Sequence, residues 1–238
     1  MSLPDWRITH YRYLASTSDV VLGRIRDGDA LPGEVVVAAV QTAGRGRQGR
    51  NWISEAGGLW LTAALPTGSA PFGQPALVAA VAACEAVQTW VPEAGVKWPN
   101  DLLVRGRKVG GILVERLARA ELAAVGIGIN VACRPTDGEL MSSAGALIEF
   151  AEAPLSPEDL LPVLLDALRR RWDEWLGGGW PSLREVWRGM DVARGRPVRM
   201  EPPGLAGLAD GIDEHGALRV RLADGSVSVA SVGEVIFV

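Results

Sequence analysis

The chain is 238 residues long, a length that suits one medium-sized domain and one smaller domain. Apolar residues make up 48% of it and charged residues 22%, so it can bury a sizeable core and has the composition of an ordinary globular protein. The net charge of -4 gives no global attraction to nucleic acid or to a membrane surface, so basic clusters need a local explanation.

The cysteines, the histidines and the apolar segments of the chain exclude several further classes of protein. The two cysteines have no CxxC spacing and the two histidines lie at opposite ends of the chain, which argues against a disulfide framework and a histidine metal site. No N-terminal apolar segment has the pattern of a signal peptide. The longest apolar stretch, 75–84, is far shorter than the ~20 residues that a membrane helix needs. We therefore expect a cytoplasmic protein.

In the first part of the chain, expected to be one domain over 1–190, β-branched and apolar runs alternate with amphipathic stretches. This alternation predicts an α/β fold. The hydroxyls of Ser16, Thr17 and Ser18 are expected to cap the first helix, and Ser156 a later one. Strands are predicted at 8–13, 34–40, 59–65, 96–98, 101–105, 108–116 and 121–131, and helices at 19–27, 75–90, 156–176 and 182–188.

The character of the sequence changes after residue 191. Short β runs are separated there by turn-forming pairs such as Asp210-Gly211 and Asp224-Gly225. This pattern predicts a small all-β barrel over 191–238, appended to the α/β domain.

Lysine and asparagine are scarce in a chain whose other basic residues are all arginine. Lys97 and Lys108 are the only lysines, and Asn51, Asn100 and Asn130 the only asparagines. One interpretation is that they are leftovers of nucleotide bias. A compact ammonium does chemistry that a planar guanidinium cannot reproduce, however, and these residues lie beside the other motif-like segments. They therefore indicate a functional site.

A glycine- and arginine-rich loop at 44–50 follows a predicted buried strand and formally matches G-x-G-x-x-G. A dinucleotide-binding loop would open a helix and be followed by an acidic residue about 20 positions later, and neither is present. Three arginines on a glycine-flexible loop favour binding of a phosphate or carboxylate, although a solvated basic loop would have the same composition. The sequence has no Walker A motif and no Ser-His-Asp or Cys-His arrangement.

Five segments, in this order, resemble biotin–protein ligases. They are Ser16-Thr17-Ser18, the run from Gln41 through GRGRQGR to Trp52, KWPND at 97–101, RKVGGILVE at 107–115, and GIGIN at 126–130. The resemblance implies a class II synthetase-like catalytic domain of mixed sheet and helices, with a C-terminal SH3-like barrel. It also implies a two-step reaction in which biotin and MgATP give biotinyl-5′-AMP, and a lysine of a biotin carboxyl carrier domain then takes the biotinyl group.

The resemblance also implies roles for individual residues. Lys108 is similar to the lysine between the biotin carboxylate and the α-phosphate, and Arg47 to a cation of the closing loop. Asp101 is similar to a residue on the metal side, which suggests Mg²⁺. The biotin-binding set is Ser16, Thr17, Ser18, Gln41, Arg45, Gly46, Arg47, Lys108, Gly110 and Gly111, and the nucleotide-binding set is Arg47, Trp52, Asn100 and Asn130.

Departures and alternatives bear on this interpretation. Ser18 stands where the family often has asparagine. Because the catalytic pattern begins almost at residue 1, the resemblance implies a dedicated ligase that does not bind DNA or membranes; a homodimer is left open. A lipoate–protein ligase, which shares the fold and the adenylation chemistry, is the main alternative. A nucleic-acid binder that uses the arginine loop, and an adaptor protein, are further alternatives.

Overall fold

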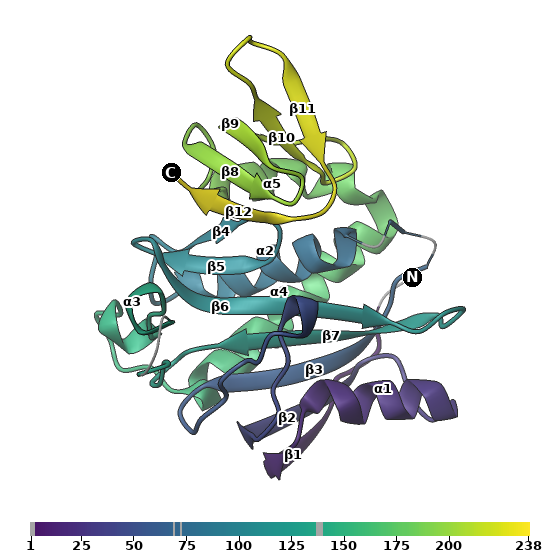
Figure 1. Ribbon diagram of the computed structural model, residues 1–238. Coiled ribbons are helices and arrows are strands. Elements are labelled where there is room, and N and C mark those ends of the chain that lie inside the picture. The colour runs from purple at the N-terminus through teal and green to yellow at the C-terminus, as the bar shows by residue number, and fades with distance from the viewer. Residues whose placement is uncertain (1–2, 69, 72, 137–139) are drawn as a thin grey trace.

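The computed structural model describes residues 3–68, 70–71, 73–136 and 140–238, which form two β-sheets and the helices packed on them (Figure 1). The larger sheet has seven strands in the order β1-β2-β3-β7-β6-β5-β4; β1 and β2 are parallel and the other neighbours are antiparallel. Its strands are β1 (Arg7–Leu14), β2 (Glu34–Gln41), β3 (Leu59–Pro66), β4 (Gly95–Lys97), β5 (Asp101–Val104), β6 (Arg107–Arg116) and β7 (Leu122–Ile129).

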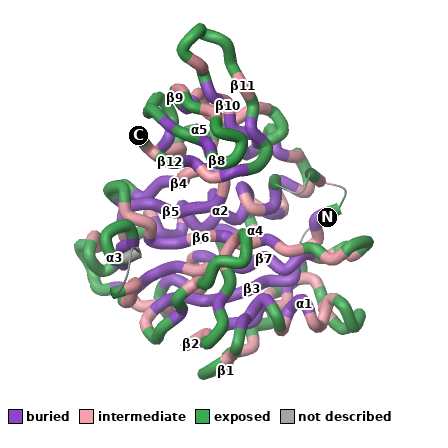
Figure 2. The backbone as a smooth tube through the Cα atoms, in the orientation of Figure 1, coloured by how far each residue is buried: buried purple, intermediate pink, exposed green. Residues whose placement is uncertain are grey.

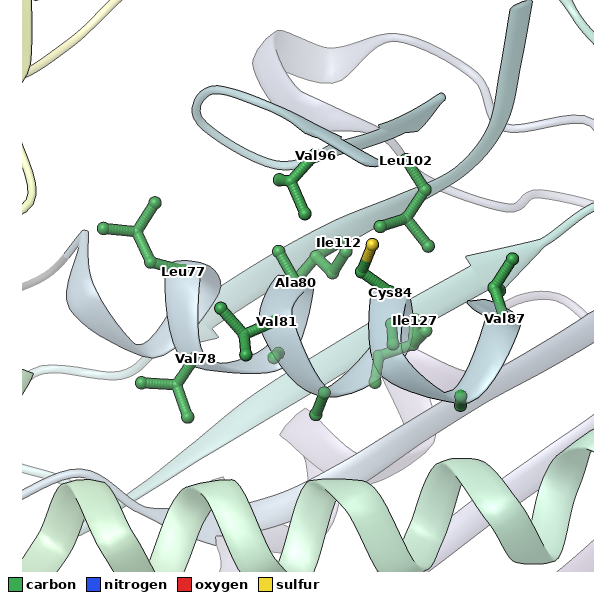
Figure 3. Close-up of a cluster of buried hydrophobic side chains, with 14 of the residues drawn as sticks. Leu77, Val78, Ala80, Val81, Cys84, Val87, Val96, Leu102, Ile112 and Ile127 are labelled. Carbon is green, nitrogen blue, oxygen red and sulfur yellow. The ribbon is translucent and has the colours of Figure 1, made fainter. Parts of the chain in front are cut away.

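One face of the larger sheet is covered by α2 (Gln74–Gln88) and α4 (Pro157–Gly178), which also pack on each other. Figure 3 shows Ala80 and Cys84 of α2 directed toward Val96, Leu102 and Ile112 of the strands. Cys84 lies in this layer with no exposed surface, and burial raises the pKa of its thiol to about 12. This apolar layer holds the sheet in place, so the opposite face is free to carry polar groups.

The opposite face of the sheet carries α1 (Thr17–Asp27), which packs across β2, β3 and β7. Side chains of a strand alternate between faces, and β7 uses this alternation directly. The side chains of Ile127 and Ile129 belong to the core beneath α2. The positions of Gly126 and Gly128, where side chains would face the α1 side, carry none. The missing side chains leave room on that side, beside the N-terminus of α1.

The smaller sheet has five antiparallel strands in the order β11-β10-β9-β8-β12. It rests on the larger sheet through α5 (Arg184–Met190), and the indole N–H of Trp98 donates to Gly216 O at 3.0 Å. Figure 2 shows that the strands of this sheet are more exposed than the central strands β3 and β7 of the larger sheet, whose edge strand β1 is also largely exposed. Its strands are β8 (Pro197–Glu201), β9 (Leu205–Ile212), β10 (Leu218–Arg221), β11 (Val227–Ala230) and β12 (Glu234–Phe237).

The expected fold class, a mixed α/β unit followed by an all-β unit, is confirmed, while the division of the chain at residue 190 stays a prediction. Two local predictions are wrong. The buried hydroxyl of Ser16 makes no capping hydrogen bond to α1, and the hydroxyl of Thr17 bonds to Thr62 instead. The last predicted helix, 182–188, is displaced: α5 begins at Arg184, after a 3₁₀ turn at Trp180–Ser182. Ser156 does cap α4, accepting from the backbone N–H of Asp159 at 3.2 Å.

Three short elements that the sequence did not predict lie in the loop between β2 and β3 and in the segment after β7. They are a 3₁₀ turn at Arg47–Gly49, the helix α3 (Leu140–Ser143) and a 3₁₀ turn at Leu147–Glu149. Within the described residues, no helix has the length and apolar character needed to cross a membrane.

Candidate functional site

A cavity of about 420 Å³ lies on the α1 face of the larger sheet. It is bounded by the N-terminus of α1, the loop between β2 and β3, the outward faces of β3, β6 and β7, and the segment after β7. Most residues predicted from the sequence to form a site converge on it. These are Ser16, Thr17, Ser18, Gln41, Arg45, Gly46, Arg47, Trp52, Asn100, Lys108, Gly111 and Asn130.

Gly110 and Asp101, also predicted as site residues, do not line the cavity. A side chain at Gly110 would point to the core, where Leu102 lies 3.1 Å from the Cβ position. Asp101 is only 6% exposed and lies behind the cavity wall. Neither residue therefore contributes surface to the cavity.

A buried chain of hydrogen bonds closes the α1 end of the cavity. The hydroxyl of Thr17 lies 2.8 Å from that of Thr62, which also lies 3.2 Å from that of Ser18. Gln41 Oε1 accepts from the backbone N–H of Thr17 at 2.8 Å, and Gln41 Nε2 donates to Ser54 Oγ at 2.8 Å. This end of the cavity therefore presents uncharged donors and acceptors in fixed positions.

Beyond the α1 end, the cavity wall is formed by the indole of Trp52, which packs directly on glycines of the sheet. The ring of Trp52 lies over β6 and β7, so a Cβ at Gly111 would lie 3.3 Å from it and one at Gly128 only 2.7 Å from its Nε1. The ammonium of Lys108 lies 5.2 Å from the centroid of the same ring. Glycine at these positions is required for the close approach of the indole to the sheet.

The arginines of the loop are each held by a different part of the molecule. Arg45 pairs with Asp19 of α1 at 3.0 Å and with Glu115 of β6 at 2.7 Å. Burial raises the pKa of Glu115, partly offset by Arg45. The loop is thus tied down on the α1 side by charge.

Arg47 and Arg50 tie the other side of the loop to the site and to the smaller sheet. Arg47 donates to Asn100 Oδ1 at 3.1 Å and to Gly233 O at 3.2 Å, and Arg50 pairs with Glu234 at 2.9 Å. Burial lowers the pKa of Arg47 from its ordinary value, and attraction by Asp101 opposes this. An arginine nevertheless stays charged near neutral pH, so Arg47 is a half-buried cation.

The two lysines of the chain converge on one carboxylate. Lys108 Nζ lies 2.6 Å from Asp101 Oδ1, and Lys97 Nζ lies 3.4 Å from Asp101 Oδ2. The pairing of β5 with β6 shifts its register between Leu102 and Leu103, which interrupts the strict alternation of β6. Lys108 and Gly111 consequently both line the cavity, although they are three positions apart.

The segment after β7 forms the remaining wall and is held by charge and by Asn130. The amide of Asn130 donates to Gly145 O at 3.0 Å. Arg107 and Arg134 both bind the carboxylate of Glu149. Burial alone would raise the pKa of Glu149, but the hydrogen bonds from these two arginines lower it. The wall beside Lys108 is therefore fastened to β6.

A divalent cation finds no ready carboxylate cage here. No group of three or more histidine, cysteine or acidic side chains that could hold a metal occurs among the described residues. Asp101, the predicted Mg²⁺ ligand, already has an ammonium beside each oxygen. The residues present therefore do not fit a metal bound by the protein alone.

Thr62, which lines the cavity, and Ser54, which orients Gln41, were missed by the sequence analysis. Gly126, Gly128 and Arg50 also line the cavity; the sequence analysis included them only within the segments 126–130 and 44–50 and gave them no individual role. The alternation of β7 offered a signal for the two glycines, because the apolar residues between them face the core. Nothing in the sequence indicated that Thr62 would meet the hydroxyls of α1.

Comparisons with known proteins agree with this geometry. The chain matches the model of the biotin/lipoate A/B protein ligase family over residues 11–132, and that of the biotin protein ligase C-terminal domain over residues 195–238. The biotin–[acetyl-CoA-carboxylase] ligase of Mycobacterium tuberculosis is 32% identical over 232 residues, which cover 93% of this chain and 85% of the relative. The bifunctional ligase/repressor BirA of Bacillus subtilis is 30% identical, over 93% of this chain and 71% of the relative.

Solved structures give the same result. The biotin protein ligase of Aquifex aeolicus in complex with biotin and ATP superposes with a TM-score of 0.85 at 25% identity, covering 97% of each chain. That of Leishmania major in complex with biotinyl-5-AMP has a TM-score of 0.66 at 26% identity, covering 95% of this chain and 99% of that one. The chain belongs to the biotin/lipoate A/B protein ligase family. Its activity is the ATP-dependent ligation of biotin to protein.

Proposed function

We propose that this chain joins the carboxylate of biotin to the α-phosphate of ATP in the cavity described above, releasing pyrophosphate. The biotinyl group of the resulting biotinyl-5′-AMP then passes to a lysine amine of a biotin carboxyl carrier domain, and AMP leaves. The observation that carries the proposal is the polarity of the cavity: buried neutral hydrogen-bonding groups close one end, and cations stand at the other.

The α1 end suits the ureido head of biotin. A ureido group has N–H donors and a carbonyl acceptor, and hydroxyls can serve either kind of group. Thr17 and Ser18 offer hydroxyls there, with Ser16 beside them, and Gln41 is held in place by Ser54. We expect Ser18 to contribute through Thr62, to whose hydroxyl it is bonded.

The other end of the cavity, called here the β6 end, contains Lys108 and Arg47 and suits the two anions that must react. A carboxylate and a phosphate repel each other, and Lys108 is a compact cation that can bridge both. Arg47 adds a second charge from the loop, and donors of this kind act most strongly where water is excluded. We therefore assign Lys108 and Arg47 to the adenylation step.

The remaining walls suit the nucleotide and the closure of the site. The Arg45-Gly46-Arg47 turn lies over the cavity as a lid that would keep water from the mixed anhydride. Trp52 offers a flat face to the adenylate, and Asn100 and Asn130 offer amides. Gly111 allows close approach to β6, and we expect Gly110 to act only through the shape of that strand.

Mg²⁺ belongs to the proposal as a partner of ATP rather than as an ion held by the protein alone. Mg²⁺ is usually bound through one or two carboxylates together with substrate phosphates. We expect Mg²⁺ to enter the site bound to the triphosphate. We also propose that the reaction takes place in the cytoplasm, where ATP and newly synthesised carrier domains are present.

The test is exchange of radiolabelled pyrophosphate into ATP, without any carrier protein. We expect exchange that requires biotin and stops when EDTA removes Mg²⁺. Exchange that ignores biotin and responds to lipoate would instead support a lipoate–protein ligase. Transfer is tested separately, by mass spectrometry of a carrier domain incubated with biotin and ATP.

A further inference from the structure

The ammonium of Lys97 lies between the two sheets. It donates to Val235 O of β12 at 3.1 Å, and the ring of Phe237 in the same strand lies 5.9 Å away. On its other side it meets Asp101 Oδ2 at 3.4 Å, and only 15% of its side chain is exposed. A largely buried cation held from two sides in this way has a fixed position.

Asp101 divides its carboxylate between the two lysines. Its Oδ1 lies 2.6 Å from Lys108 Nζ, while its Oδ2 faces Lys97. Lys97 and Asp101 are direct partners in the β4–β5 ladder, and Asp101 pairs in turn with Gly111 of β6. The strand register therefore sets the position of the carboxylate, and the carboxylate sets the position of the Lys108 ammonium.

The charges of these three groups do not cancel. Two ammonium groups share one carboxylate, so one positive charge is left over. Without Lys97, Asp101 would pair with Lys108 alone and neutralise it, and a buried carboxylate releases such a partner at considerable cost. With Lys97 present, Lys108 keeps a charge that can be offered to incoming anions.

We propose that Lys97 is a positioning residue for adenylation. Lys97 donates to Val235 O and pairs with one oxygen of Asp101, and in this way it fixes the position of the Lys108 ammonium and leaves that ammonium with a net positive charge. This inference rests on the proposed role of Lys108. It gives the smaller sheet a part in the reaction, because β12 supplies the oxygen on which Lys97 is seated.

The experiment measures single-turnover formation of biotinyl-5′-AMP in a double-mutant cycle. Lys97→Met keeps the length of the side chain and removes its charge, and we expect a rate about 10- to 100-fold lower, the scale of a small displacement of a reacting group. In an Asp101→Asn background, the same change should alter the rate by about twofold or less, because Lys97 would have lost the group through which it acts. Lys97→Arg restores the charge and should recover part of the rate.

The matched control is Arg105→Met, which removes a cation from the turn after β5, where Arg105 pairs with Glu93 at the surface. It should leave the rate unchanged. An equal loss for Lys97→Met in both backgrounds, or a loss for Lys97→Arg as large as for Lys97→Met, would mean that Lys97 only supports the fold and would overturn the inference. If Lys108→Ala itself keeps the wild-type rate, the proposed function of Lys108 fails instead, and the two failures are thus told apart.

Discussion

At the α1 end of the cavity the polar side chains bond to one another, whereas at the β6 end each cation is held by an oxygen of the protein. Thr62 has no exposed surface, and Thr17 and Ser18 are 3% and 5% exposed. The side chain of Lys108 is 34% exposed and that of Arg50 is 53% exposed. One end is therefore buried and fixed, and the other is open to water and ions.

The difference fits the proposed roles of the two ends. A neutral head group is best bound by donors and acceptors that are already in place, since preorganisation lowers the cost of binding. Reacting anions instead need cations. In the structure Asp101 and Glu234 hold Lys108 and Arg50 in place, and we propose that the charge left on Lys108 is offered to the substrate anions.

Lys108→Ala removes the main cation of the β6 end and should have the largest effect on the rate of adenylation. Removing the cation between carboxylate and phosphate should lower the rate of adenylation about 10²- to 10³-fold, the scale for one transition-state donor. Lys108→Arg should recover little, because a broad planar fork does not fit the position of a compact ammonium. The measurement is single-turnover adenylation, followed by quenched flow.

Thermal unfolding serves as the control for this variant. Asp101 keeps its contact with Lys97 when Lys108 is removed, so the melting temperature should change little. Equal adenylation rates in Lys108→Ala and in the wild type would remove Lys108 from the reaction.

Arg47→Gly also changes the β6 end of the cavity, but it should affect the retention of biotinyl-5′-AMP rather than its formation. Loss of a charge-assisted contact of about 1.5–3 kcal/mol should raise the release of biotinyl-5′-AMP roughly 10- to 150-fold. The measurement is biotinylation of lysines on a bystander protein such as serum albumin. A mutant that releases the intermediate no faster than the wild type would show that the loop is not a lid.

Thr62→Val tests the α1 end. It removes the hydroxyl that joins Thr17 to Ser18 and leaves both groups short of a partner. Losing about 1–2 kcal/mol should raise the KM for biotin roughly 5- to 30-fold while leaving the KM for ATP unchanged. Thr67→Val is the matched control, because Thr67 is also buried but lies outside the cavity. A rise in the KM for ATP alone would contradict the division between the two ends.

The two ends also differ in how far the sequence predicted them. The elements of the larger sheet were predictable because β-branched runs bounded by Gly and Pro are local signals. The cations and amides of the site were found through the resemblance and through the scarcity of lysine and asparagine. Local signals and motif positions were thus sufficient for the fold class and for most residues around the cavity.

The contacts that organise those residues were not predictable. Thr62 meets the α1 hydroxyls only because β3 lies beside β7 and below α1, a strand order that the sequence does not state. The partner of Arg50 lies 184 positions away, in β12. The sharing of Asp101 by two lysines depends on the register of three strands. Each of these is a tertiary pairing without a local pattern.

The smallest expected effect concerns the wall beside Lys108, where Glu149 binds Arg107, Arg134 and the backbone N–H of Ala146. Because the pKa of Glu149 is lowered in the fold, its ionised form stabilises the protein above the ordinary glutamate pKa, and this stability is lost as the pH falls through the lowered value. Glu149→Gln should lower the free energy of unfolding by about 1 kcal/mol or less at pH 7, and the difference should shrink toward pH 4. Urea unfolding at the two pH values measures it. Glu185→Gln, which removes an exposed pair with Arg188 on α5, is the control and should show no difference at either pH. A deficit for Glu149→Gln that is the same at both pH values would mean that the wall is held by the shape of the side chain and not by its charge.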